Sequence, residues 1–191
     1  MKRYMGVFVM LGCVACASGS TLFTYDSLSI GASAGEIQDY MEGIAGIATE
    51  LTGGTNQPYV NNIGPLGDEY GPYVYTAGEN MGWVEFRFEE PLQSCEFHWA
   101  VLNGSLRVYA DDHQFLVTDP VRDAWDRRNH PTRFGGYDSS FHRLRFEGVW
   151  GEGQSGAIGV DNLIIQVVPE PAAMGLLAMG GVALIRRRRT A

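Results

Sequence analysis

The sequence predicts a mainly β protein whose body is a single antiparallel β-sandwich of the jelly-roll type, between an N-terminal signal peptide and a short C-terminal hydrophobic helix. Two observations predict this class. Apolar and polar residues alternate in many short segments, and turn-forming residues, including 25 glycines and 8 prolines among 191 residues, separate them. Once the two terminal segments are set aside, residues 18–168 suit one domain with a self-sufficient core.

The first part of this body carries the weakest signals. Residues 21–30 predict an opening strand with some apolar side chains on both faces. Residues 36–51 place apolar side chains near helical spacing, but Gly43 and Gly46 would each weaken a helix by about 1 kcal/mol. We therefore expect a short helix or an irregular segment there. Residues 52–80 are rich in Gly, Pro, Asn and Tyr, which predicts turns with short extended pieces.

The β signal strengthens from Trp83 onward. Residues 83–88 predict a strand that ends at Glu89-Glu90-Pro91, and residues 94–101 predict a second strand with Glu96 and His98 pointing outward. The inward side chains of these two strands are Val84, Phe86, Phe88, Cys95, Phe97, Trp99 and Val101. A lone cysteine in such a run is expected to be a small buried apolar residue.

The next segments read as turns and short strands. Asn103-Gly104 is a strong two-residue hairpin signal, so residues 105–110 are predicted to pair with the strand before them. A turn at Asp111-Asp112-His113 then leads into a strand over residues 114–118. The polar stretch that follows predicts a helical turn over residues 121–129.

Two further strands complete the body. Residues 141–149 alternate, with Phe141 on the same face as Arg143, Arg145 and Glu147. Residues 157–168 form the predicted closing strand.

The N-terminus predicts export. Lys2 and Arg3 form a short positive region, Met5 to Val14 is apolar, and Ala15-Cys16-Ala17 is a small-x-small cleavage pattern. Residues 1–17 therefore read as a secretory signal peptide for the Sec machinery and signal peptidase, cleaved there or by Ser20. The alternative is a lipoprotein signal at one of the two leader cysteines, Cys13 or Cys16.

The C-terminus, residues 168–191, has three parts: a Pro-Glu-Pro element, an apolar run over residues 172–185 and an arginine cluster. The run is shorter than the roughly 20 residues of a membrane-spanning helix. It could serve as a short anchor with the arginines on the cytoplasmic side, and the alternative is a buried core helix with a solvated basic end. The residues at its two ends are Val168, Pro169, Glu170 and Pro171, then Arg186, Arg187, Arg188 and Arg189.

This arrangement resembles the PEP-CTERM sorting signal of Gram-negative bacteria. The resemblance implies an exosortase-type membrane protease as a partner and delivery to the cell envelope or an exopolysaccharide matrix, with residues 172–185 as a transient inner-membrane anchor. The strand around Asp161-Asn162-Leu163 is similar to closing strands that often precede such tails. That similarity implies a sandwich like those of carbohydrate-binding or concanavalin-like domains.

The charge of the body excludes one class of partner. Residues 18–168 contain 8 arginines and 21 acidic residues, which gives a net charge of about −13. Such a field repels nucleic acid, so DNA and RNA binding are excluded, and it favours solubility in an external medium.

No catalytic motif stands out in the chain. The four histidines are scattered, and zinc, nucleophile-elbow and P-loop motifs are absent from the sequence. Hard oxygen ligands at Asp111, Asp112 and Asp161 make Ca²⁺ the most plausible ion, although aspartate at a turn needs no metal to explain it. Glu85 and Glu96 are outward-facing carboxylates, but many such pairs exist among 21 acids.

The aromatic residues of the loops suggest a ligand surface. The candidates for stacking on a sugar are Tyr70, Tyr73, Tyr75 and Trp125. The same tyrosines could instead pack on a strand edge, because tyrosine favours strands. We therefore expect a non-enzymatic surface protein that contacts polysaccharide. The alternatives are a polysaccharide-active enzyme on a jelly roll and a purely structural matrix component.

Overall fold

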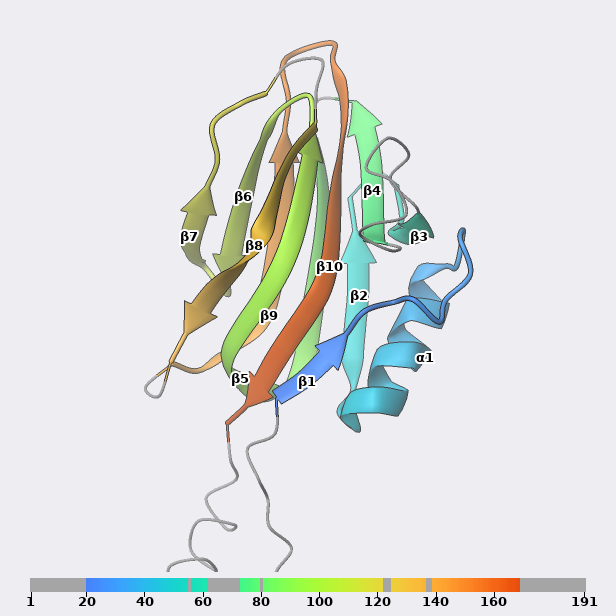
Figure 1. Ribbon diagram of the computed structural model, residues 1–191, viewed down its shortest axis with the longest axis vertical. Coiled ribbons are helices and arrows are strands. Elements are labelled where there is room, and N and C mark those ends of the chain that lie inside the picture. The colour runs from blue at the N-terminus through green and yellow to red at the C-terminus, as the bar shows by residue number, and fades with distance from the viewer. Residues whose placement is uncertain are drawn as a thin grey trace, which may run out of the picture. The chain divides into compact units, whose positions relative to one another are not determined.

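The described part of the chain forms ten strands and one helix (Figure 1). The computed structural model describes residues 20–54, 56–61, 73–79, 81–121, 125–136 and 139–168, with the backbone alone for 125–131. The predicted signal peptide and sorting tail lie outside these residues. The elements are β1 (Ser20–Phe23), α1 (Ala34–Ala45), β2 (Thr49–Gly53), β3 (Tyr59–Asn61), β4 (Tyr73–Glu79), β5 (Met81–Leu102), β6 (Ser105–Ala110), β7 (His113–Val117), β8 (Trp125–Gly135), β9 (Phe141–Val149) and β10 (Ser155–Val167).

The strands lie in two antiparallel layers that β5 joins. The first half of β5 pairs with β2 and β9, and β9 continues through β6 to β7; we call this the second sheet. The second half of β5 pairs with β8 and β10, and β10 continues through β4 to β3 and also carries β1; this is the first sheet. The predicted antiparallel β-sandwich is confirmed.

The continuity of β5 corrects one prediction. We expected a strand end at Glu89-Glu90-Pro91, but β5 runs through this point and changes partners there. The ladder to β9 is irregular between Arg87 and Leu92, and an irregular position tolerates the missing N–H of proline. The Pro91 carbonyl still accepts a bond from the Val168 N–H at 2.8 Å.

The turn at Asn103-Gly104 also differs from its prediction. Asn103 has the expected positive φ of 56°, but β6 pairs with β9 and β7 rather than with β5. The two residues therefore carry the chain from one layer to the other. The true hairpin is β6–β7, closed by Asp111 and Asp112 between the paired residues Ala110 and His113.

The core lies between the two layers and is dominated by aromatic rings. The Phe97 ring of the first sheet meets the Phe146 ring of the second edge-on, with centroids 4.8 Å apart. Phe115 and Phe134 stack across the layers at 4.1 Å. All seven side chains predicted to point inward from the 83–101 region are buried.

Helix α1 begins at a capping box, because the Ser33 hydroxyl accepts a bond from the Glu36 N–H while the Glu36 carboxylate accepts from the Ser33 N–H. The helix ends at Gly46, whose φ of 69° favours glycine. Its buried residues Ile37 and Met41 face the domain, and it contacts β1, β2 and β3. The predicted helix is thus confirmed for 36–45, and the residues after it turn into β2.

Three further predictions need correction. The opening strand predicted over 21–30 ends at Phe23, because Tyr25 adopts a positive φ of 58° and a turn follows. The helical turn predicted over 121–129 is wrong from Trp125, where β8 begins. Among the described strands β8 pairs only with β5, and an edge strand tolerates polar residues and Pro131. Finally, Phe141 is buried whereas His142 is exposed, because the irregularity opposite Pro91 shifts the alternation.

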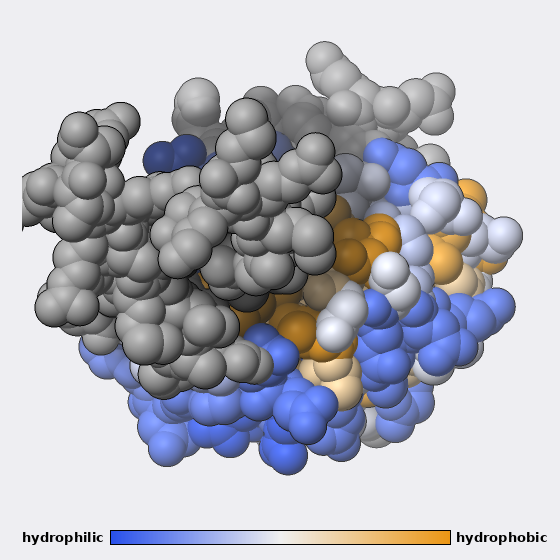
Figure 2. Space-filling model, turned by 90° about the horizontal axis from the view of Figure 1, so that it is seen from below, coloured by the Kyte–Doolittle hydropathy of each residue, from blue (hydrophilic) through white to orange (hydrophobic). Residues whose placement is uncertain are grey.

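The surface is mostly polar, in keeping with the acidic composition. Figure 2 views the end of the domain where β1 begins and β10 ends, and its coloured surface is largely hydrophilic around one apolar area. The exposed large apolar side chains include Leu22 of β1 and Ile44 of α1, each 47% exposed. Within the part of the chain that the structure describes, no helix combines the length and hydrophobicity needed to cross a membrane.

Candidate functional site

Of the four aromatic residues predicted to stack on sugars, the structure describes the side chains of Tyr73 and Tyr75. Tyr73 is buried at the start of β4, with 3% of its surface exposed. Tyr75 is partly buried two residues on, and its ring meets Tyr59 of β3 edge-on at 5.2 Å. Trp125 begins β8, whose side chains lie outside the described residues at this point, and Tyr70 lies outside them altogether.

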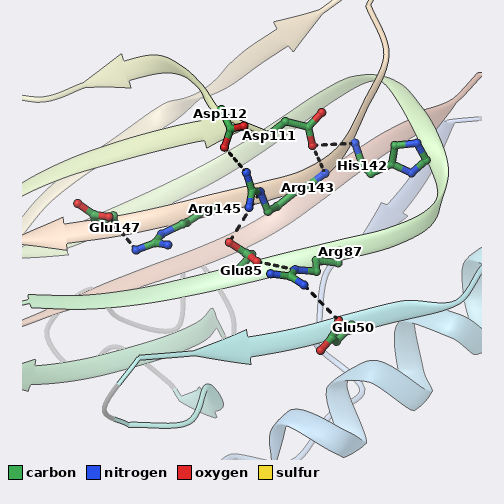
Figure 3. Close-up of polar contacts among 9 residues, drawn as sticks. All are labelled: Glu50, Glu85, Arg87, Asp111, Asp112, His142, Arg143, Arg145 and Glu147. Atoms are coloured by element: carbon green, nitrogen blue, oxygen red, sulfur yellow. Dashed lines mark hydrogen bonds and ion pairs between the residues drawn. The ribbon is translucent and has the colours of Figure 1, made fainter.

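The outer face of the second sheet carries an ordered polar surface. Register places three rows of side chains across it, because directly paired residues of neighbouring strands share a face. The rows are Trp83, Glu147 and Arg107; Thr52, Glu85, Arg145 and Tyr109; and Glu50, Arg87 and Arg143. We call these ten residues the polar face; most of its charged members appear in Figure 3.

Glu85 is the centre of the polar face. Only 3% of its side chain is exposed, although it lies on the outer side of the sheet. One carboxylate oxygen accepts from Arg87 Nε at 2.6 Å, and the other lies 4.0 Å from Arg143 Nε (Figure 3). The two arginines are paired across β5 and β9 and would repel each other. The carboxylate between them offsets this repulsion and fixes both side chains.

A second cluster surrounds Glu147. Its carboxylate binds Arg145 Nη2 at 3.0 Å and lies 3.7 Å from Arg107 Nη1. The Arg145 guanidinium also lies over the Trp83 ring, 4.6 Å from its centroid, which is cation–π geometry. Arg145 Nε is buried without a hydrogen-bond partner among the described residues. The aromatic ring and both arginines are therefore held in defined orientations.

Sequence reasoning found part of this surface. The alternation marked Glu85 as outward-facing, and it placed Arg143, Arg145 and Glu147 on one side of their strand. The alternation did not predict that these two strands pair, because the sequence of one strand does not determine its register with a distant strand. A usable signal was the matching pattern of charges at every second position in 85–87 and 143–147.

Two of the three predicted calcium ligands serve the fold. Asp111, with a positive φ of 49°, accepts bonds through Oδ1 from the backbone N–H groups of His142 and Arg143, at 3.1 and 2.9 Å. Asp112 pairs with Arg143 Nη2 at 2.5 Å. Both aspartates therefore attach the β6–β7 turn to β9 (Figure 3).

Asp161 has a different environment. It is 2% exposed, and its Oδ2 accepts a bond from the Asn162 side-chain amide at 3.0 Å, while Oδ1 is buried without a partner among the described residues. Burial raises the pKa of Asp161 to about 7; a bond from the Asn162 backbone lowers it, and the charge of Asp26 raises it. No group of three or more His, Cys, Asp or Glu side chains suited to a metal occurs among the described residues.

Cys95 behaves as the sequence predicts. It is 3% exposed in the core, and burial raises the pKa of its thiol to about 12, which a bond from the backbone of Phe134 offsets in part. His98, three residues away, points to the other side of β5, where it contacts the Asn162 amide. The thiol is therefore neither ionised nor paired with a base.

Solved structures similar to this chain include three variants of the family 29 carbohydrate-binding module CBM29-2. One, complexed with mannohexaose, has 13% identity and a TM-score of 0.44 over 77% of this chain and 90% of that one. A second variant has 14% identity and a TM-score of 0.42 over 80% of this chain and 99% of that one. A third, complexed with cellulohexaose, has 15% identity and a TM-score of 0.39 over 76% of this chain and 90% of that one. At such identities and TM-scores, these likenesses assign no ligand and no binding residue to this chain.

Two comparisons concern the sequence itself. No curated protein matches the chain. Residues 167–189 match the model of the PEP-CTERM protein-sorting motif, which confirms the resemblance seen in the Pro-Glu-Pro element, the apolar run and the arginine cluster. The chain thus carries a PEP-CTERM protein-sorting motif, the mark of an exported protein that is sorted to the cell surface.

Proposed function

We propose that this exported domain binds a neutral polysaccharide through the polar face, without cleaving it. One observation carries the proposal. Trp83, Tyr109, Arg107 and Arg145 lie on neighbouring strands of one sheet surface, and the Glu147 carboxylate holds the two arginines in place. The proposed ligand site is therefore a sheet face rather than the loops.

The residue types on this face suit the chemistry of a sugar chain. A pyranose ring carries hydroxyl groups around its rim and C–H groups on its faces. Planar guanidinium and carboxylate groups can bond two adjacent hydroxyls at once, while Tyr and Trp offer an apolar ring with a polar end. Side chains within a row lie at the strand spacing of about 4.8 Å, so an extended chain that runs across the strands could make contacts over several sugar units.

The ion pairs prepare the face for binding. Arginine side chains lose much rotamer freedom when a ligand immobilises them, and this loss weakens binding. On the polar face, Arg87, Arg143 and Arg145 are already held by Glu85 or Glu147. Binding would therefore cost less entropy than it would on a surface of free side chains.

Charge selects among polysaccharides. The net charge of about −13 on residues 18–168 opposes the approach of a polyanion. The positive groups of the polar face are largely matched by carboxylates of the same face. We therefore expect neutral chains to bind better than uronic acid-rich chains.

The test compares variants of the full chain by their retardation in native gels that contain neutral or anionic polysaccharides. Tyr109→Ala and Arg107→Ala remove a ring and a cation from the polar face. Tyr59→Ala and Arg133→Ala remove the same groups from the first sheet, where Arg133 is 76% exposed. We expect the first pair to weaken binding about tenfold or more, and the control pair to leave it unchanged.

Three results would contradict the proposal. A wild-type chain that binds no polysaccharide would favour a purely structural matrix component. Equal loss in both pairs of variants would remove the polar face as the site. Release of reducing sugar ends by the wild-type chain would favour a polysaccharide-active enzyme.

A further inference from the structure

We propose a Ca²⁺ site at the irregularity of β10, formed by the carboxylates of Asp161 and Asp26, which attaches the turn after β1 to β10. The site is separate from the polar face and does not depend on the proposed function. It joins two segments of the first sheet that are far apart in sequence.

The backbone changes partners at this place. Strand β10 pairs with β4 up to Val160 and with β1 from Leu163 onward. Its ladder to β5 is broken between Asp161 and Ile164, and Asn162 adopts a positive φ of 49°. The side chain of Asp161 therefore lies where neither neighbouring ladder is continuous.

Asp161 needs a partner that the described residues do not provide. Its Oδ1 is buried and unbonded, and no arginine of the described chain forms an ion pair with it. The neighbouring His98 contacts the Asn162 amide instead. A buried carboxylate oxygen without a hydrogen bond or a compensating charge is costly, so either a proton or a cation must satisfy Oδ1.

Asp26 supplies a second carboxylate. It lies in the turn closed by the Leu28 N–H and the Tyr25 carbonyl at 2.9 Å. This turn follows Phe23, which pairs with Leu163 of β10, so it begins beside Asp161, and the charge of Asp26 acts on that residue. The Tyr25 ring beside it is buried, and its hydroxyl contacts the Met41 sulfur at 3.9 Å. Asp26 is exposed whereas Asp161 is buried, so an ion held between them would take its water ligands on the side of Asp26.

The donor set favours calcium. Two carboxylates are hard oxygen ligands, and Ca²⁺ accepts six to eight oxygens, including water, in flexible geometry. Mg²⁺ demands near-ideal octahedral geometry, and zinc prefers His and Cys ligands. With only two acidic side chains we expect weak binding, with a Kd on the order of 10⁻⁴ to 10⁻³ M, as in other extracellular modules.

The test measures thermal unfolding and calcium titration calorimetry of the full chain at neutral pH. We expect Ca²⁺ at about ten times its Kd to raise the Tm of the wild-type chain by about 3–6 °C over EDTA. Asp161→Asn should abolish this shift. In EDTA, the same variant should melt at or above the wild-type temperature, because it removes an uncompensated buried charge. Asp112→Asn, whose side chain is 99% exposed, should keep the full calcium shift.

Asp26→Asn provides a second test if Asp161→Asn does not fold. Asp26 is exposed, so we expect its replacement to leave the fold intact. This variant should weaken calcium binding about tenfold or more. The proposal is overturned if the wild-type chain binds no Ca²⁺ by calorimetry, or if Asp161→Asn or Asp26→Asn keeps the wild-type affinity. An equal Tm shift from Mg²⁺ would overturn the assignment to calcium. Polysaccharide binding measured in EDTA reports on the polar face alone, so the two proposals can fail independently.

Discussion

Glu85 illustrates how one residue can organise a surface. Its neighbours Arg87 and Arg143 face each other across two strands, and both side chains retain access to water at 53% and 30% exposure. The carboxylate itself is almost fully buried. A charge in such a place is acceptable only because oppositely charged groups surround it. The residue is thus a structural requirement of the polar face before any ligand is considered.

Replacing Glu85 with Gln should lower the free energy of unfolding by about 1–2 kcal/mol, because the amide removes a charge-assisted bond and leaves two like-charged guanidinium groups together. The matched control is Glu50→Gln. Glu50 lies 3.9 Å from the same arginine but is 59% exposed, so its loss should cost no more than about 0.5 kcal/mol. Urea unfolding of the two variants checks the difference. Equal effects would show that burial of Glu85 does not matter.

At this scale the sequence predicted which side chains point inward, because alternation along one strand is local information. Cys95, Phe97 and Trp99 are buried as expected. The alternation placed Phe141 on the polar side of its strand, but Phe141 is buried and His142 is exposed. The reason is that an irregularity in the opposite strand shifts the alternation by one residue. Such an irregularity depends on the partner strand, which no local pattern reveals.

Trp150 connects several strands of the domain. Its indole N–H donates to the Gly78 carbonyl at 3.0 Å, and its ring covers three glycines of β5, β9 and β10. A Cβ on Gly82 would lie 3.2 Å from this ring, and one on Gly156 would lie 2.5 Å away. A Cβ on Gly148 would also lie 2.7 Å from the Ile158 side chain. These glycines are needed because a large ring lies flat against the sheet.

Gly148→Ala should therefore lower the free energy of unfolding by about 1–3 kcal/mol through overpacking against Trp150 and Ile158. The control is Gly43→Ala in α1, where an added Cβ meets nothing within 4 Å. That substitution should instead raise stability by about 0.5–1 kcal/mol, because alanine favours the helix. Opposite signs in thermal or urea unfolding are the expected result. A neutral Gly148→Ala would show that the ring can move aside.

At the scale of elements, the sequence predicted segments better than their partners. It placed the helix, the 83–101 strand segments and the Asp111-Asp112 turn, but it joined β6 to the wrong strand at Asn103-Gly104. Positive φ at Asn103 fits a hairpin and an inter-layer turn equally well. The strand β8 was missed because a polar edge strand lacks the alternation of a half-buried one.

For the whole molecule, β5 is the strand that connects the two layers. Its first half belongs to the second sheet and its second half to the first. The predictions of export came from both chain ends, and the motif match at 167–189 confirms the sorting motif at the C-terminus. The polar face could not be predicted as a surface, because it exists only after β5 and β9 pair in a particular register. Local sequence thus predicts the sorting of this protein more readily than its candidate site.

The continuity of β5 predicts how the domain unfolds. Since one strand contributes to both layers, and rings such as Phe97 and Phe146 interlock across them, neither sheet can keep its core after the other is lost. We expect a single cooperative transition in urea. All four tryptophans lie within the body, with Trp83 in the second sheet and Trp99 in the first, so fluorescence reports on the domain and not on the chain ends.

The measurement uses two variants that each keep one of these reporters, with the other three tryptophans changed to phenylalanine. Both variants should give the same midpoint when fluorescence and far-UV circular dichroism are followed on the same sample, even if both are less stable than the wild-type chain. The calorimetric and van't Hoff enthalpies of the wild-type chain should also agree. Fluorescence midpoints that separate from the circular dichroism midpoint in either variant would show that the two layers unfold independently and that β5 does not couple them.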